Sequence, residues 1–437
     1  MKSLSDLLRN AGVVGAGGAG FPTHVKAQSK SEFVVANGAE CEPLLHKDTE
    51  LMIEKAARVV KGLELMLEAT GAKEGIIGVK QKKKDAIAAL EKACKGTHCR
   101  VHPLGDYYPT GDEYVLVYET TGRLIPPRGL PIQAGVVVDN IETLINVSLA
   151  AEGKPVTQKM LTVAGAVKNP MTVSAPLGTS FEEVLRAAGG ITVEKFGIFI
   201  GGVMMGRLTG DLQLPVTKTT NALIVLPEEH QLVRRMRRPQ KDMYRIGKSA
   251  CDQCSYCTEF CPRYLLGYDI QPHRVMRSLG FTASGEAYWN QYAQLCSECG
   301  LCTLFSCPES LYPREACQKG KRDFAAKGLK WDGRKEVKTH PMMPGRRVPV
   351  KRLVKRLGLT SFDVPAPLQE HPIKPSSARI LLQQHVGKPA VACVKAGDRV
   401  KAGQMIAATP EKELGVAIHA SMDGVVKEVG TFVLIQG

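Results

Sequence analysis

The first 150 residues of the chain alternate between helical and extended hydrophobic patterns. In LSDLLRNAG (4–12) the leucines recur at helical spacing and a glycine follows, which predicts a short amphipathic helix. The segment EFVVANGAECEP (32–43) starts with a β-rich apolar run and ends in a polar turn. In GVVVDNIETLINV (135–147) a buried strand leads to Asn140 and then to a helix. Strands that alternate with helices predict an α/β domain, which we expect over residues 1–153.

Three other patterns occupy the rest of the chain. Residues 154–233 alternate β-rich runs with turns and contain one helix, which predicts a small β-grasp domain. A stretch rich in Pro, Lys and Arg (331–376) predicts a linker with little core. Residues 377–437 have short strands broken by Gly-Asp and Lys-Ala-Gly turns, and they resemble a biotinyl- or lipoyl-like barrel sandwich. Lys412 lies near the hairpin where carrier domains present a lysine, but their flanking residues are missing, so we expect a structural or docking role.

The composition is that of an ordinary globular protein, with 437 residues, 44% of them hydrophobic. No apolar run reaches the roughly 18 residues needed to cross a bilayer, and the N-terminus does not have the pattern of a signal peptide. We therefore expect a cytoplasmic protein without direct membrane insertion. The net charge of +15 gathers in runs such as RRMRRPQK (234–241) and KRLVKR (351–356), which we interpret as solvated faces. Aromatic residues make up only 5% and the sequence shows no base-reading module, so no nucleic-acid partner is expected.

Thirteen cysteines in a reducing compartment indicate metal ligands rather than disulfides. The runs CDQCSYCTEFCP (251–262) and CSECGLCTLFSCP (296–308) each place three thiols at i, i+3 and i+6 and a fourth before proline. The first run fits the bacterial ferredoxin pattern, in which the fourth cysteine serves the other [4Fe-4S] cluster. The second run has one more residue before its last cysteine. Crosswise pairing gives two ligand sets: Cys251, Cys254, Cys257 and Cys307 for one cluster, and Cys296, Cys299, Cys302 and Cys261 for the other.

Zinc is the alternative occupant of these cysteine runs. Structural zinc sites usually come as paired C-x2-C knuckles with four ligands, and two triplets that each end in Cys-Pro do not fit that arrangement. We therefore expect two [4Fe-4S] clusters close enough to exchange electrons. The other cysteines show no ligand spacing, and we expect them to be packing thiols: Cys41, Cys94, Cys99, Cys317 and Cys393.

A glycine-rich segment, GAGGAGFPTHVK (15–26), follows the first predicted helix. Gly15, Gly17 and Gly20 form a G-x-G-x-x-G match, and Glu40 lies 20 positions further on. A dinucleotide fingerprint should follow a buried strand and open a helix, whereas the residues before this segment have helical periodicity. A plain tight turn explains the motif equally well on its own. Glycines still allow a backbone to approach a phosphate or a ring closely.

Together with YYPTGDEYVLVYETTGR (107–123), these segments resemble the flavin-bearing, NADH-oxidising subunit of respiratory complex I and the C subunit of the Rnf complex. The resemblance covers about the first 330 residues, in order. It implies an α/β multidomain fold with a Rossmann-like FMN domain and a β-grasp SLBB domain. It also implies an α-helical ferredoxin-like domain with two [4Fe-4S] clusters at 234–330. The linker comes next, and the barrel-sandwich hybrid domain comes after the linker.

In that family the glycine loop embraces FMN rather than a dinucleotide. The resemblance implies two catalytic residues. Phe21 would stack on the nicotinamide, and Glu113 would accept hydrogen bonds from NADH. The chain departs from complex I at Ala39, where that subunit has an aspartate, although NGAECEP looks like the Rnf form. The implied cofactor-binding residues are Gly15, Gly17, Gly18, Lys26, Asn37, Glu40, Tyr108, Gly111, Asp112, Asp139 and Asn140.

The position of the barrel sandwich distinguishes the chain from Rnf C subunits, in which a similar domain precedes the flavin region. An order with this domain last resembles the cobalamin reductases of propanediol-utilisation microcompartments. It implies an NADH-dependent enzyme that reduces a corrinoid toward cob(I)alamin inside a microcompartment, with a corrinoid-handling enzyme and microcompartment proteins as partners. The sequence contains no D-x-H-x-x-G motif, so we expect the corrinoid to bind loosely or on a partner. An Rnf-like peripheral subunit and a non-catalytic electron-transfer scaffold are the alternatives.

Overall fold

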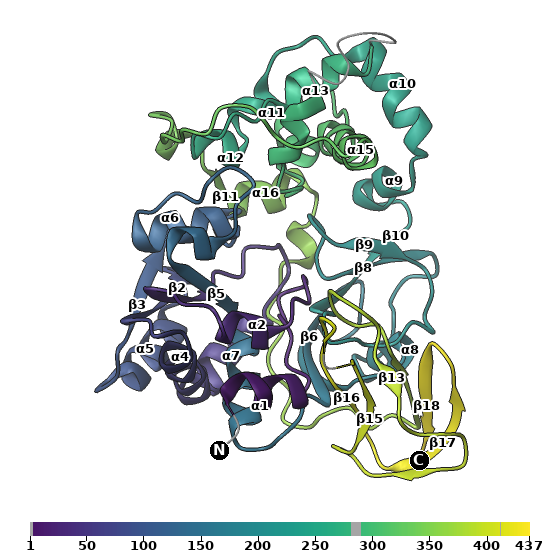
Figure 1. Cartoon of the computed structure of the whole chain (residues 1–437). Coiled ribbons are helices and arrows are strands. Elements are labelled where there is room, and N and C mark those ends of the chain that lie inside the picture. Colours follow the sequence, from purple (N-terminus) through teal and green to yellow (C-terminus); the bar gives the residue numbers. More distant parts are fainter. Residues whose placement is uncertain (1–2, 281–289, 411) are drawn as a thin grey trace.

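The computed structural model describes residues 3–280, 290–410 and 412–437. Figure 1 shows an N-terminal α/β region at the lower left, a small sheet region beside it, a helical region above both, and a C-terminal β region in yellow at the lower right. The expected multidomain α/β architecture is confirmed, since each region has its own sheet or group of helices.

A four-stranded parallel sheet in the order β3-β2-β1-β5 forms the centre of the N-terminal region. Its strands are β1 (Phe33–Gly38), β2 (Glu74–Lys80), β3 (Cys99–Leu104) and β5 (Val136–Asn140). Its helices are α1 (Leu4–Asn10), α2 (Thr23–Ala27), α3 (Lys47–Glu54), α4 (Ala56–Thr70), α5 (Lys84–Cys94), α6 (Glu113–Thr121) and α7 (Ile141–Ala151). Both faces of the sheet are covered, α4 and α7 packing on one and α6 on the other, so the middle residues of β1, β2 and β5 are apolar and buried, whereas the edge strand β3 carries Arg100 and His102.

The order of the strands creates a switch point between β1 and β5. From β1 the chain moves outward to β2 and β3 and then returns to the other side of β1 as β5. In open parallel sheets, ligands bind outside the carboxyl ends of the strands at such a point. At these ends Asn37 lies directly opposite Asn140, and Ala36 lies opposite Asp139. Three of the expected flavin-site residues therefore meet at the switch point.

The second region is a five-stranded sheet in the order β7-β6-β10-β8-β9 with a single helix packed on it. Its elements are β6 (Gln158–Gly165), β7 (Met171–Pro176), α8 (Phe181–Ala187), β8 (Phe196–Ile200), β9 (Arg207–Thr209) and β10 (Ala222–Pro227). β6 and β10 are parallel, while the other neighbours are antiparallel. Ser180 caps α8 with a capping box to Glu183, which explains why a helix starts within this β-rich stretch. The predicted β-grasp fold is confirmed.

The cysteine-rich region consists of short helices. They are α9 (Gln231–Arg237), α10 (Gln240–Ala250), α11 (Tyr256–Glu259), α12 (Pro262–Leu265), α13 (Pro272–Ser278), α15 (Pro313–Ala326) and the 3-10 turn η2 (Gln291–Leu295). Proline at the first position sets where α12, α13 and α15 begin. The additional residue of the second cysteine run lies in the π-helical turn η3 (Cys302–Ser306), where the amide of Cys307 donates to the carbonyl oxygen of Cys302.

The expectation of little core in residues 331–376 is wrong for the middle of this stretch. Strand β11 (Val348–Pro349) pairs with β4 (Tyr107–Tyr108) in the N-terminal region. Helix α16 (Val350–Arg356) follows and buries Leu353 in a core shared with the β-grasp region. The basic side chains of KRLVKR stay exposed while its leucine and valine point inward, so composition alone concealed an amphipathic helix.

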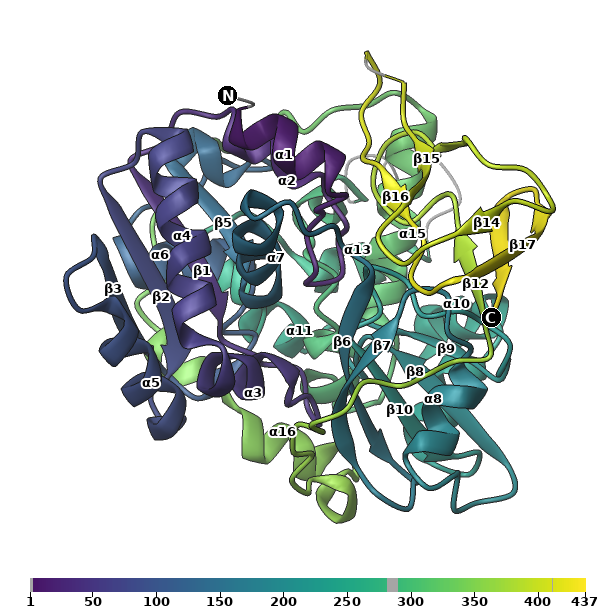
Figure 2. The same cartoon turned by 90° about the horizontal axis from the view of Figure 1, so that it is seen from below.

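The C-terminal region is a sandwich of two small sheets, in the orders β12-β18-β17-β14 and β13-β15-β16. Its strands are β12 (Ser377–Leu381), β13 (Val391–Ala392), β14 (Arg399–Val400), β15 (Met405–Ala408), β16 (Ile418–His419), β17 (Gly424–Val429) and β18 (Phe432–Gln436). Figure 2 shows β15 and β16 beside α1. The guanidinium of Arg9 donates to the carbonyl oxygen of Pro410 at 2.7 Å, and the amide of Ala417 donates to the carbonyl of Arg9. The first and last domains of the chain are therefore docked together.

Candidate flavin and iron-sulfur sites

The glycine segment forms a closed loop between α1 and α2. The amide of Gly15 donates to the carbonyl of Phe21 at 2.8 Å, and the amide of Gly20 donates back to the carbonyl of Gly15 at 3.2 Å. Gly18 has a φ of +118°, which side chains disfavour, and Gly17 and Gly18 are exposed. A helix precedes the loop, as the sequence indicated, so the loop offers bare backbone at the switch point without a Rossmann turn.

The carboxyl end of β5 stands next to this loop. A Cβ on Gly17 would lie 3.4 Å from Cβ of Asn140, so the loop and the strand end are in contact. The ammonium of Lys26 forms an ion pair of 3.1 Å with Oδ1 of Asp139. Burial raises the pKa of Asp139, and Lys26 opposes this shift. Oδ2 of Asp139 is buried and has no hydrogen-bond partner among the residues the structure describes.

The segment before α6 forms the opposite wall. The amide group of Asn37 donates to the carbonyl of Gly111 at 3.0 Å, which holds this segment against the end of β1. Asp112 caps α6 by accepting from the amides of Tyr114 and Val115. Glu113 is partly buried, and burial raises its pKa while Lys26 across the site lowers it. A carboxylate and an ammonium thus face one another across the switch point.

Glu40 has a different surrounding from the other expected residues. Its carboxylate accepts hydrogen bonds from the amide of Asp48 at 2.7 Å and from the amide and hydroxyl of Thr49, at the start of α3. Asp48 in turn accepts from the side-chain amide of Asn140 at 2.9 Å. Glu40 therefore stabilises a helix N-terminus and supports Asn140 through Asp48.

A buried ionic network below the glycine loop was missed by sequence reasoning. Glu142 accepts from Lys47 at 3.0 Å and also pairs with Lys159, which the β-grasp region contributes. The ammonium of Lys159 also donates to the carbonyl of Ala16 in the loop at 3.2 Å. Burial lowers the pKa of Lys159 to about 8, with Glu142 acting in the opposite direction. The one local signal was Glu142, the single charged residue in the run NIETLINV.

The residues at the switch point fit FMN. Backbone amides of exposed glycines and the Lys26 ammonium suit a phosphate. The free Oδ2 of Asp139 and the side chain of Asn37 provide polar groups for a ring system. A Cβ added to Gly18 would meet only the side-chain amide of Asn221, at 3.5 Å, among the described residues. The site has open backbone on one side and unsatisfied polar atoms on the other, as a bound flavin requires.

The cysteines gather in two groups. Four thiols from both runs line one cavity: Cys251, Cys254, Cys257 and Cys307. Burial raises the pKa of Cys257, and the sulfurs of Cys251, Cys307 and Cys254 raise it further. No three His, Cys, Asp or Glu side chains in the described ranges meet the requirements of a site for a single metal ion. The four thiols are instead spread over the wall of the cavity.

The second group contains Cys261 of the first run and three cysteines of the second run. Burial raises the pKa of Cys299 and of Cys302, and the nearby sulfurs of Cys261 and Cys296 contribute to both shifts. Cys317, expected to be a packing thiol, is fully buried and hydrogen bonds to Cys296. The structure therefore places Cys307 with the first run and Cys261 near the second run, and the assignment of these two sets to two clusters stays a prediction.

Two contacts join the flavin site to the second cysteine group. The hydroxyl of Tyr108 donates to the carbonyl of Cys299 at 2.6 Å, and both residues are buried. Arg263, two residues after Cys261, forms an ion pair of 3.0 Å with Asp112. A hydrophobic core containing Val35 of β1 also contains Cys261. The second group is thus anchored at the flavin site, while Cys254 of the first group is exposed.

Family models match the chain in four consecutive segments. They describe a Nuo51 FMN-binding domain at 8–149, an SLBB domain at 160–208, a 4Fe-4S dicluster domain at 250–312 and an RnfC barrel sandwich hybrid domain at 365–437. The predicted FMN and [4Fe-4S] cofactors and the SLBB and barrel assignments are confirmed. Among the described residues, the structure contains no helix that is long and apolar enough to cross a membrane.

The chain is also similar to individual proteins, over all or part of its length. It is 42% identical over 433 residues to the cobalamin reductase PduS of Salmonella typhimurium, which covers 98% of this chain and 94% of that protein. It is 37% identical over 275 residues to the C subunit of the Na(+)-translocating ferredoxin:NAD(+) oxidoreductase complex of Acetobacterium woodii, covering 61% and 59% of the two chains. A solved NAD+-reducing [NiFe]-hydrogenase in the air-oxidized state aligns with a TM-score of 0.48 and 20% identity, over 83% of this chain and 67% of the other.

Proposed function

The chain belongs to the PduS family of cobalamin reductases, and we propose that it transfers electrons from NADH through FMN and two [4Fe-4S] clusters to a corrinoid. The observation that carries this function is the pair of contacts between the flavin site and the second cysteine group. Tyr108 and Asp112 bond directly to the segments that hold Cys299 and Cys261. These contacts would hold the flavin site and the neighbouring cluster at a fixed separation, which suits electron transfer between them.

The FMN site that we propose is built on the switch point of the parallel sheet. The glycine loop and Lys26 hold the phosphate, and Asn37, Asp139 and Asn140 bind the ring system from the strand ends. Bound FMN accepts a hydride, two electrons at once, and releases single electrons. Lys159 and Glu142 fix the loop from below, so that the backbone amides keep their direction. Of the other expected ligands, Glu40 and Asp112 act indirectly, Glu40 through α3 and Asp112 through α6 and Arg263.

Two residues are proposed to receive NADH. The backbone carbonyl of Phe21 closes the glycine loop, and Phe21 is half-buried, so we assign its ring to stack on a nicotinamide. Glu113 stands at the first position of α6, with a carboxylate available to accept hydrogen bonds from ribose hydroxyls. The nearby Lys26 and Arg263 favour its ionised form against burial.

The two cysteine groups are proposed to ligate the clusters crosswise. The group of Cys261, Cys296, Cys299 and Cys302 is next to the flavin site, so a cluster held there would be the first to accept electrons from the flavin. The group of Cys251, Cys254, Cys257 and Cys307 reaches the surface at Cys254. The overall reaction converts NADH and cob(III)alamin to NAD+, a proton and cob(I)alamin. Cobalt gains two electrons in this reaction, one at a time.

The test is an anaerobic reaction of pure protein, NADH and cob(III)alamin, in which cob(I)alamin is trapped by an alkylating agent. We expect alkylcobalamin to form with NADH and not in its absence. If no alkylcobalamin forms while ferredoxin reacts readily with the same preparation, an Rnf-like electron-transfer role replaces this function. If the protein reduces neither and binds no flavin, it is a non-catalytic scaffold.

We also propose that the enzyme works inside a microcompartment beside a corrinoid-handling enzyme. The position of the barrel sandwich at the end of the chain supports this, because it is the domain order expected for the microcompartment type of reductase. Tagged protein expressed with shell proteins should sediment with intact compartments. Recovery only in the unbound fraction would contradict this location.

A further inference from the structure

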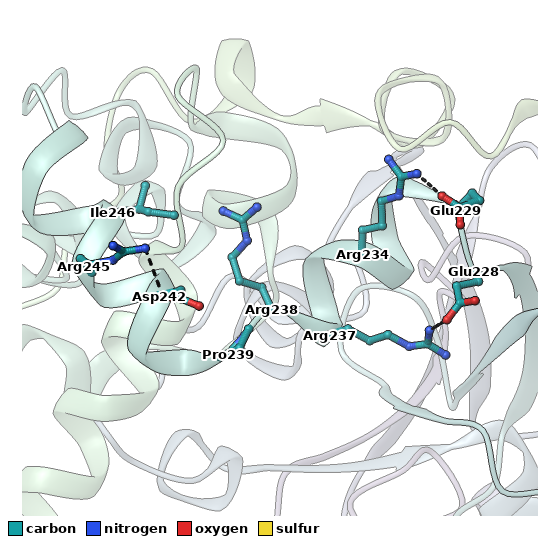
Figure 3. A pocket seen from close by; sticks show the side chains of 9 residues that line it. All are labelled: Glu228, Glu229, Arg234, Arg237, Arg238, Pro239, Asp242, Arg245 and Ile246. Atoms are coloured by element: carbon teal, nitrogen blue, oxygen red, sulfur yellow. Dashed lines mark hydrogen bonds and ion pairs between the residues drawn. The ribbon is translucent and has the colours of Figure 1, made fainter.

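Two adjoining hollows lie beside the cysteine-rich region. The first has a volume of about 550 Å³ and lies between the end of β10, α9 and the start of α10. Figure 3 shows four arginines around it: Arg234 and Arg237 on α9, Arg245 on α10, and Arg238 between the two helices. The second has a volume of about 430 Å³. Because Arg238 lines both, the two hollows adjoin at this residue, and we call the pair the α9–α10 groove.

The arginines in this groove differ in their partners. Arg234 pairs with Glu229, Arg237 with Glu228 and Arg245 with Asp242, as the dashed lines in Figure 3 show. Arg238 is exposed and has no carboxylate partner in the part of the chain that the structure describes. Its guanidinium lies 5.9 Å from the centre of the Tyr312 ring. The groove therefore has one cation available to an anionic ligand group.

The second hollow has a mixed lining. Three methionines contribute apolar, polarisable surface: Met205, Met236 and Met243. Met205 is 57% exposed, which is high for a large apolar side chain. Gln240, Gln318 and Ser297 add amide and hydroxyl groups. Methionine surfaces adapt to large ligands, and a few polar groups fix a ligand's orientation.

The groove borders both cysteine groups. Ser297 and Glu298 line it and stand between Cys296 and Cys299 in the chain. Ile246, in the wall of the first hollow, packs in the same hydrophobic core as Cys251. A ligand in the groove would therefore lie against the segments that hold both clusters.

We propose that the α9–α10 groove is the binding site for the corrinoid acceptor, an inference that rests on the proposed function. A corrinoid has a broad apolar macrocycle, a rim of amides and one phosphodiester. The methionines receive the macrocycle, Gln240, Gln318 and Ser297 bond the rim amides, and Arg238 pairs with the phosphodiester. The clusters that the two cysteine groups would hold would supply one electron, drawn from NADH, to reduce a bound cob(II)alamin to cob(I)alamin. The groove has no histidine among its described lining residues, in keeping with the absence of a D-x-H-x-x-G motif.

The experiment compares two corrinoids with two variants. Hydroxocobalamin carries the phosphodiester, whereas cobinamide does not. Arg238→Glu should raise the KM for hydroxocobalamin about tenfold, as expected when a charge-assisted contact becomes repulsive, and change that for cobinamide by less than about twofold. Met205→Trp fills the apolar part of the groove and should raise the KM for both corrinoids. Both side chains are exposed, so neither change should impair folding.

Arg399→Glu, on the exposed face of the barrel region, is the charge-matched control and should leave both KM values unchanged. The rate of ferricyanide reduction by NADH shows whether the flavin and the fold are intact in each variant. An unchanged KM for hydroxocobalamin in both groove variants overturns the proposed site, and an acidic protein partner then becomes the occupant to examine. Failure of the proposed function would look different from failure of the proposed site, because the wild-type protein would then reduce neither corrinoid. Equilibrium dialysis with hydroxocobalamin still reports in that case whether the groove variants bind less than the wild type.

Discussion

The hydroxyl of Tyr108 donates a hydrogen bond of 2.6 Å to the carbonyl oxygen of Cys299. Tyr108 belongs to the segment that forms one wall of the flavin site, and Cys299 belongs to the second cysteine group. Both are buried, so the bond is shielded from water and fixes the two sites relative to one another. Electron transfer between the sites depends on such fixed separation.

Tyr108→Phe should weaken this connection. The carbonyl of Cys299 would lose a buried donor, which typically costs about 1–2 kcal/mol of the free energy of unfolding. We also expect slower reduction of the clusters by NADH, followed by stopped-flow absorbance, with flavin content preserved. Thr172→Val is the control, because that buried hydroxyl donates to the carbonyl of Ala366 at 2.8 Å in the β-grasp region. Equal rates of cluster reduction in the two variants would count against a role for the Tyr108 contact.

Cys261→Ala tests the crosswise ligand sets. Because Cys261 lies with Cys296, Cys299 and Cys302, we expect the loss of that cluster and a fall from about eight to about four iron atoms per chain. The remaining EPR signal should be that of the cluster held by the other group. Cys99→Ala removes a buried thiol in the α/β region and should leave the iron content unchanged. If Cys261→Ala instead removes the cluster held by Cys251, Cys254 and Cys257, the crosswise ligand sets are wrong.

The sequence was informative where the chemistry is local. Ligand spacing within each cysteine run predicted the two groups, and the helical pattern before Gly15 argued against a Rossmann turn. The ionic network of Lys47, Glu142 and Lys159 was not predictable in this way, since its members come from three separate elements and only the fold brings them together.

Two other features depended on tertiary structure. Leu353 looked like part of a basic linker, and its burial is decided by the strand pairing of Val348 that precedes it. The expected role of Glu40 at the flavin was drawn from its place in a motif. Its positive φ of 36° and its bonds to α3 give it a helix-capping function that sequence position does not reveal.

Gly17→Val tests the proposed flavin site. Gly17 is exposed, and a Cβ there would already lie 3.4 Å from Asn140, so a branched side chain would occupy the space next to the strand end. We expect FMN affinity to fall by about tenfold or more, with little change in thermal stability. Flavin released on denaturation and the thermal midpoint measure the two effects. Gly210→Val is the control, because a Cβ at that glycine meets nothing within 4 Å among the described residues. Full flavin content in the Gly17 variant would contradict the assigned site.

Lys218 is a buried cation at the junction of three regions. Its ammonium donates to the carbonyl oxygens of Gly12 at 2.7 Å and Ala417 at 3.0 Å, and the structure shows no carboxylate paired with it among the described residues. Burial lowers its pKa to about 7 from an ordinary value of 10.5. The neighbouring titratable groups are His385 and His419, whose pKa values are also lowered, mainly by burial. Both histidines are therefore neutral above pH 7, and Lys218 alone changes charge in the alkaline range.

The stability of the junction should consequently rise with pH. Between about pH 7 and pH 10.5 the unfolded chain holds a proton on Lys218 that the folded chain has lost, so the free energy of unfolding increases by at most about 1.4 kcal/mol per pH unit. Below about pH 7 Lys218 is protonated in both the folded and the unfolded chain, so it no longer makes the free energy of unfolding depend on pH. Lys218→Met removes the titrating group, so its thermal midpoint should rise less than that of the wild type from about pH 7 to about pH 9.5. Lys395→Met, an exposed lysine of the barrel region, should follow the wild type, and scanning calorimetry at several pH values compares the three proteins. Parallel curves for the wild type and Lys218→Met would mean that Lys218 keeps its charge in the folded protein and that its two carbonyl partners are sufficient to stabilise it.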